Sequence, residues 1–142
     1  MRDLIDELAG IAPGSRLDGL RALRPDVRSS LAGYEAAIFD GESGLTGAER
    51  HAVARHVAEL NAEAALAAHH QARAGDSARL PVLLDYATLI THTPDQATPG
   101  AIEKLMAAGL APRDVVMLGQ LIAHLNMQAR LLAGLRLLEQ AA

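Results

Sequence analysis

Hydrophobic positions recur every three or four residues along most of the chain, which is the spacing of amphipathic helices. Two short helices are expected first, over 3–10, closed by Gly10, and over 17–23, with Ser15 or Asp18 as the N-cap of the second. Pro25 suits the first turn of a longer helix of about ten to fifteen residues. Its apolar face is formed by Val27, Leu31, Tyr34, Ala37 and Ile38.

The region 46–74 begins with a strong helix-start signal. Thr46 is a favourable N-cap, and Glu49 three residues later completes a capping box. The apolar face behind it comprises Ala52, Val53, His56, Val57 and Leu60, and an Ala-rich segment follows over 62–74. Periodicity leaves open whether 46–74 is one helix or two. Asn61 is the weakest helix former at the join.

Three further helices complete the pattern. The segment 80–90 is strongly apolar and is expected to be buried on more than one side. A loop over 91–98 leads to a helix that begins at Thr98 and Pro99 and ends near Gly109, and a last helix runs from Pro112 over roughly seven turns. The sequence therefore predicts a single all-α domain over residues 1–142, with six or seven helices.

Composition agrees with helices and excludes several classes of function. Ala and Leu dominate, as helices favour, whereas the aromatic share is only 2% and gives no platform for stacking nucleic-acid bases. The net charge of −4 provides no basic excess for a phosphate backbone, and no apolar run approaches the ~20 residues of a membrane span, so we expect neither a nucleic-acid nor a membrane partner. Cysteine is absent, which excludes thiol redox chemistry and thiolate metal sites in this chain alone and fits a cytoplasmic location.

Histidine is the remaining candidate for chemistry, because phosphate-loop, dinucleotide and nucleophile-elbow motifs are missing. Four of the six histidines lie within 46–74, with three glutamates: His51, His56, His69, His70, Glu49, Glu59 and Glu63. Three interpretations stay open: solvated or core-edge histidines, a shared acid–base site, or a metal site. His56, Glu63 and His70 are seven residues apart, about 10 Å on a straight helix. A joint site therefore needs a break near Asn61.

The two remaining histidines give weaker signals. His124 lies in the apolar last helix, where a satisfied core or interface histidine is expected. His92 stands beside Pro94 in the expected loop and is assigned to the surface.

Several segments resemble the carboxymuconolactone decarboxylase-like family, which includes the alkylhydroperoxidase D proteins. The segments are LTGAERHAVARHVAELN over 45–61, the following 64–70, and the C-terminal TPGAI, AGLAPRDVV and QLIA. The N-terminal IDELAGIAPGS with Arg24, Pro25 and Asp26 is similar to a branch found beside an alkylhydroperoxidase-domain partner. The resemblance implies the all-α alkylhydroperoxidase D-like fold and a homo-oligomer, often a trimer or hexamer.

The resemblance also locates where this chain departs from the family pattern. His70 stands in the place of the family's histidine, Leu66 in that of the second cysteine and Glu63 in that of the first, while His51 replaces the proton-relay glutamate. Peroxide reduction in the family needs a thiolate and a resolving thiol, so this chain cannot perform it.

Three functions remain in view, one of which is a metal protein that uses His51, Glu63 and His70. Acid–base chemistry of the decarboxylase kind, or small-molecule binding, needs only positioned proton donors and acceptors, for which His51, Glu63 and His70 are the candidates. No cofactor is required. The alternative is a non-catalytic structural or regulatory homologue that acts through assembly with itself or a partner. Which of His69 and His70 faces inward is left open.

Overall fold

The computed structural model describes residues 3–141, and every regular element within them is helical. The elements are α1 (Leu4–Leu8), α2 (Arg16–Ala22), α3 (Pro25–Asp40), α4 (Gly47–Leu60), α5 (Ala64–Gln71), α6 (Leu80–His92), a 3₁₀ turn η1 (Pro94–Gln96), α7 (Pro99–Ala107) and α8 (Pro112–Gln140). The predicted all-α fold class is confirmed.

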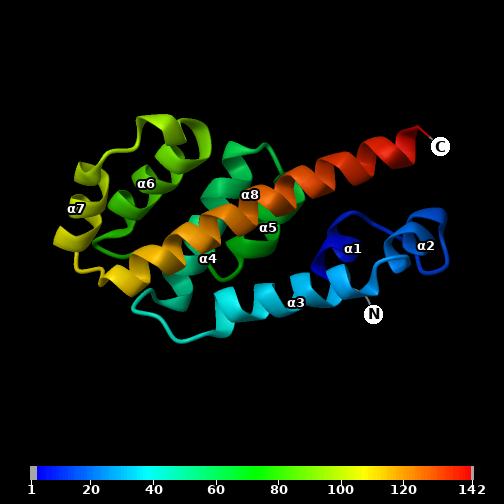
Figure 1. Ribbon diagram of the computed structural model, residues 1–142, viewed down its shortest axis with the longest axis horizontal. Coiled ribbons are helices and arrows are strands. Elements are labelled where there is room, and N and C mark those ends of the chain that lie inside the picture. Colours follow the sequence, from blue (N-terminus) through cyan, green and yellow to red (C-terminus); the bar gives the residue numbers. More distant parts are fainter. Residues whose placement is uncertain (1–2, 142) are drawn as a thin grey trace.

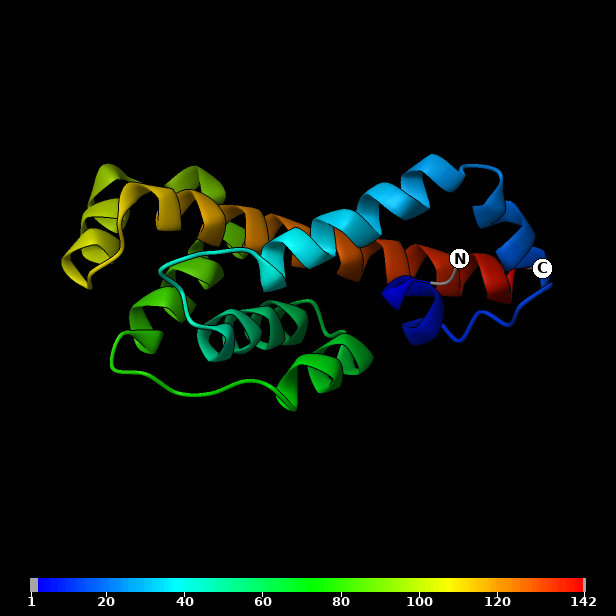
Figure 2. The same cartoon turned by 90° about the horizontal axis from the view of Figure 1, so that it is seen from below.

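The long helix α8 organises the molecule. It runs across the whole structure, with α6 and α7 beside its N-terminal end and α1 and α2 beside its C-terminal end (Figure 1). The antiparallel α4–α5 hairpin packs against its middle, and α3 contacts both α4 and α8 (Figure 2). The three helices α3, α4 and α5 therefore meet beside the centre of α8.

The core is built almost entirely from aliphatic side chains. The members with a relative exposure of 0% are Ala54, Val57, Ala58, Leu66, Leu83, Ala87, Leu105, Leu118, Leu121, Ile122, Leu125 and Leu132. Burying each leucine contributes about 1.5–3 kcal/mol. Five of the twelve lie on α8, so the apolar stripe of this helix is the part of the core shared by the other elements.

Polar side chains fix the helix starts around α4. Thr46 and Glu49 form the predicted capping box, and Glu49 also accepts hydrogen bonds from Arg79, just before α6. Buried Arg50 donates to the carbonyl oxygens of Phe39 and Leu45, which closes the α3–α4 loop. These bonds hold the end of α3 against the first turn of α4.

Three predictions about the helices need correction. The described residues contain eight α-helices and a 3₁₀ turn, more than the six or seven predicted, and His92 ends α6 instead of lying in a loop. The helix α6 is buried along one side only, at Leu83 and Ala87. The prediction that α6 is buried on more than one side is wrong, because other side chains of α6 line a hollow toward α7.

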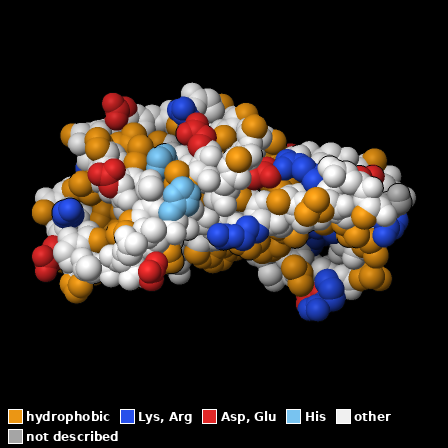
Figure 3. Space-filling model, turned by 90° about the horizontal axis from the view of Figure 1, so that it is seen from above, with side chains coloured by type: hydrophobic (Ala, Val, Ile, Leu, Met, Phe, Trp, Pro, Cys, Tyr) orange, Lys and Arg blue, Asp and Glu red, His pale blue; other side chains and the backbone are white. Residues whose placement is uncertain are grey.

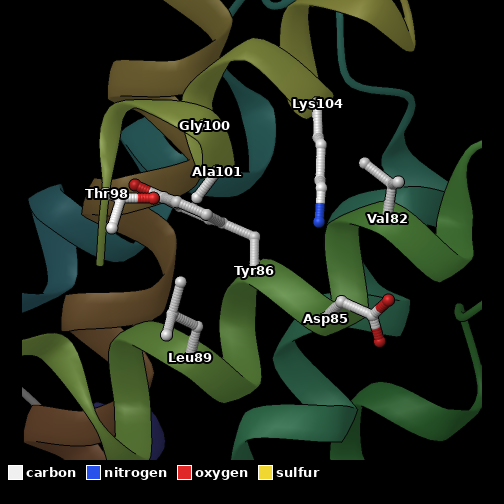
Figure 4. Close-up of a pocket in the computed structure, with 8 residues that line it drawn as sticks. All are labelled: Val82, Asp85, Tyr86, Leu89, Thr98, Gly100, Ala101 and Lys104. Atoms are coloured by element: carbon white, nitrogen blue, oxygen red, sulfur yellow. The ribbon is translucent and has the colours of Figure 1, made fainter. Parts of the chain in front are cut away.

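That hollow has a volume of about 280 Å³ (Figure 4). Asp85 and Tyr86 enter it from α6, and Lys104 from α7. The surrounding surface mixes charge types: on the face drawn in Figure 3, Lys and Arg side chains are separated from one another by hydrophobic and acidic ones. No single helix in the described range is long and apolar enough to cross a membrane; α7 and α8 pass such a test only as a pair bent by 115°.

Candidate functional site

The break that the sequence left open occurs between α4 and α5. Ala62 has a positive φ of 56°, and the amide of Glu63 donates to the carbonyl of Ala58 at 2.9 Å. With the Ala62 amide on the carbonyl of Glu59, this is a Schellman ending with alanine where glycine is usual. Asn61 secures the turn by donating to Asn126 of α8. The chain reverses here and α5 returns along α4.

The reversal brings His51 of α4 and His70 of α5 together. Their Nδ1 atoms are 3.0 Å apart, so one ring donates a proton and the other accepts it. His70 is completely buried, which settles its orientation: it faces inward, while His69 is half-buried. The ring of Phe39 stacks on both paired histidines, with centroids 4.7 and 5.0 Å away.

The environment keeps both paired imidazoles neutral. Burial lowers the pKa of His70 to about 3, and the nearby His69 and His51 add to the effect. Burial also lowers the pKa of His51, while the carboxylate of Glu35 acts in the opposite direction. At neutral pH the pair therefore carries no net charge: one N–H lies between the two Nδ1 atoms, and the accepting ring carries its own N–H at Nε2.

A second polar group lies beside the pair and comes from α3 and α8. Glu35 Oε2 accepts hydrogen bonds from His124 Nε2 and, at 2.9 Å, from Gln128 Nε2. The ring of Tyr34 meets that of His124 edge to face. Ligand atoms of Glu35, His69 and His70 all lie within 4.8 Å of one another. The two groups thus form one site, the histidine cluster: Glu35, His51, His69, His70, His124 and Gln128.

A small cavity lies between the cluster and α1. Its volume is about 120 Å³, and Glu35 and Gln128 line it together with Leu4 and Leu31. Half-buried His69 lies on another side of the cluster. Space for a small ligand therefore borders the cluster at Glu35 and Gln128.

Glu63 lies outside the cluster. Its carboxylate pairs with Arg136 of α8, at 2.7 Å for Oε2, and no hydrogen bond within residues 3–141 joins it to His51 or His70. Glu63 begins α5 and His70 lies near its end, so the helix itself separates them. His56 is also elsewhere, bonded to Thr88 at 2.7 Å.

Sequence reasoning missed Glu35 and placed His124 only in the core or at an interface. His124 is indeed 3% exposed, but its polar partner comes from α3, 89 positions away. A signal for Glu35 existed: it is four residues after Leu31 and four before Phe39, so an acid occupies the inward row of α3.

Comparison with known proteins supports the fold. No protein-family model matches the chain, and no curated protein matches it in sequence. The chain is similar to the crystal structure of an uncharacterized peroxidase-related protein from Silicibacter sp. TM1040, with a TM-score of 0.62 and 21% identity over 75% of this chain. It spans 66% of that protein's length. At this identity the shared property is the all-α fold.

Proposed function

We propose that this chain is a cysteine-free protein of the peroxidase-related fold that uses the His51–His70 pair for acid–base chemistry on a small molecule. The observation that carries the proposal is the 3.0 Å contact between two buried Nδ1 atoms from different helices. Its assignment to the carboxymuconolactone decarboxylase-like and alkylhydroperoxidase D-like family belongs to the proposal and rests on the sequence resemblance and the similar fold.

The chemistry follows from the neutral pair. A neutral imidazole can accept the carboxyl proton of a bound acid. When carbon dioxide departs and leaves an electron pair on carbon, the imidazolium can donate that proton to the carbon. Glu35 is the nearby charge that favours a transient imidazolium at His51, against burial and the positive charge of Arg73, which have the larger effects on its pKa. As the resemblance implies, His51 stands in the place of the glutamate of the family relay and His70 in that of its histidine, and no thiol step is needed.

Substitution of both paired residues tests this proposal. The assay is carbon dioxide release from carboxymuconolactone and from a simple β-keto acid, with wild type, His51→Gln, His70→Gln and the control His56→Gln. We expect the first two variants to lose 10²–10⁴-fold in kcat/KM, the range for a general acid or base, and the control to keep its activity. No acceleration by wild type on either substrate, or full activity of His70→Gln, would reject the proposal.

The second candidate is a structural homologue, and two residues favour it. Leu66, at the place of the family's second cysteine, is completely buried in the core. Glu63, at the place of the first, is bound in an ion pair to α8. Both positions serve packing here. If the assay above shows no turnover, assembly becomes the function to examine, with a homo-oligomer or an alkylhydroperoxidase-domain protein as the expected partner.

A further inference from the structure

Three side chains of the histidine cluster have the composition of a metal site. Glu35 comes from α3, and His69 and His70 are consecutive residues at the end of α5. Each offers one ligand atom, and these atoms lie within 4.8 Å of one another. We propose that Glu35, His69 and His70 bind one divalent transition-metal ion. The proposal does not depend on the acid–base function, although His70 belongs to both.

Hydrogen bonds leave a ligand atom available on His70 and on Glu35. His51 occupies Nδ1 of His70, and the remaining Nε2 atom is buried without a hydrogen bond in the described residues. His124 and Gln128 both donate to Oε2 of Glu35, and the hydrogen bonds seen at this carboxylate leave Oε1 open. Metal-binding histidines and carboxylates are held by outer partners in this way.

The hydrogen bond between His51 and His70 also determines the tautomer of His70. If His70 donates Nδ1–H to His51, its Nε2 atom carries the lone pair that a metal requires. This arrangement needs no change in the 3.0 Å contact. A metal ion would also give a partner to Nε2 of His70, which is otherwise buried without one.

Distances permit a metal after small side-chain movements. Bonds of about 2.0–2.2 Å to nitrogen and oxygen place ligand atoms roughly 3–3.5 Å apart in a tetrahedral site. The separations between ligand atoms, which are at most 4.8 Å, must therefore decrease by no more than about 1.8 Å. Glu35 and His69 are half-buried and can rotate, whereas His70 is fixed by its neighbours.

The ligand set selects the class of ion. Two imidazoles and one carboxylate suit zinc or iron(II), while calcium and magnesium require mostly oxygen ligands. Three protein ligands leave at least one coordination position for water or a small molecule. A metal here could therefore bind a ligand directly, which a purely structural ion with four protein ligands does not.

Cobalt(II) is a suitable probe because its visible absorption reports the coordination geometry. Metal-free full-length protein, with any histidine tag removed, is titrated with Co²⁺ and then challenged with Zn²⁺. We expect one Co²⁺ per chain, displaced by Zn²⁺. Glu35→Gln and His69→Ala should each lower the affinity at least tenfold, and His51→Ala should lower it 10–100-fold as an outer partner.

The matched control is His92→Ala, which removes an exposed histidine at the end of α6 and should leave binding unchanged. Circular dichroism confirms that each variant is folded. His69 is half-buried, so its variant decides the question even if others unfold. Binding that is absent in wild type, unaffected by His69→Ala, or lost in His92→Ala would overturn the proposal.

The metal and the acid–base proposals can fail separately. Decarboxylation that persists after chelation, together with no Co²⁺ binding, would reject the metal site alone. Stoichiometric Co²⁺ binding without any turnover would reject the acid–base function alone.

Discussion

The ion pair between Glu49 and Arg79 offers a quantitative test of how the site is supported. Glu49 lies two residues before His51 and accepts bonds from the Thr46 amide and from two Arg79 nitrogens, all at 2.9 Å. The hydrogen bonds from Arg79 contribute most to lowering the pKa of Glu49 to about 2, from 4.5. We expect Glu49→Gln to destabilise the protein and to disturb the first turn of α4.

The magnitude follows from linkage. One pKa unit corresponds to about 1.4 kcal/mol, so the full shift would give about 3 kcal/mol. Arg79 is partly exposed, at 22% of its side chain, and solvent screening reduces this to about 2 kcal/mol. Because the pKa of Glu49 is lowered in the folded state, its stabilisation is present above pH 4.5. It is lost as the pH falls toward 2.

Urea unfolding of wild type and Glu49→Gln at several pH values measures this difference. The control is Glu59→Gln, which breaks an exposed pair with Arg55 on the same helix and should cost only about 0.3–0.5 kcal/mol. A Glu49→Gln effect no larger than the control, or a difference that persists at pH 2, would refute the reasoning.

Further expectations concern the site and its supports. Burial lowers the pKa of His70, so below pH 6.5 the unfolded state binds more protons than the folded state. The free energy of unfolding therefore falls as the pH is lowered toward 3, by up to about 1.4 kcal/mol per pH unit. His70→Gln should flatten this slope in urea unfolding of chelator-treated protein between pH 7 and 5. Ala62→Gly should raise stability by up to about 1 kcal/mol in thermal unfolding, because glycine accepts the positive φ without a Cβ penalty; a lower melting temperature would contradict the strain at this turn. Glu63→Gln should cost about 1 kcal/mol through its pair with Arg136 yet leave Co²⁺ affinity unchanged; a weaker Co²⁺ complex would place Glu63 in the site. Light scattering should find an oligomer. Leu137 is 66% exposed near the end of α8, and Leu137→Glu should shift the protein toward the monomer. A monomeric wild type would contradict this prediction.

The sequence predicted the helices well because their signals are local. The capping box at Thr46, the prolines at the starts of α3, α7 and α8, and the three-to-four spacing each act within a few residues. The extent of burial was less accessible. The residues of α6 are apolar enough for a fully buried helix, but the position of α7 leaves one side open.

The site was predicted only in part, because its contacts cross long separations. His51 and His70 could be named as candidates, yet their contact depends on the left-handed turn at Ala62, where the sequence has no glycine to announce a helix end. Glu63 was a reasonable candidate by position. Its partner Arg136 is 73 residues away, and no spacing rule could reveal that competing ion pair.

The energetics of the histidine pair favour a function over a structural role. Buried polar groups lose hydration, and an apolar pair of similar volume at the same place is often neutral or stabilising. Leu66, one helical turn before His70, is already a fully buried apolar residue, so this part of the core accommodates apolar side chains. His51 and His70 instead remain polar and paired, beside an acid and two further histidines, and one ring nitrogen has no partner. An arrangement that costs stability and leaves a buried nitrogen available is the arrangement expected where a proton or a metal ion is to be bound.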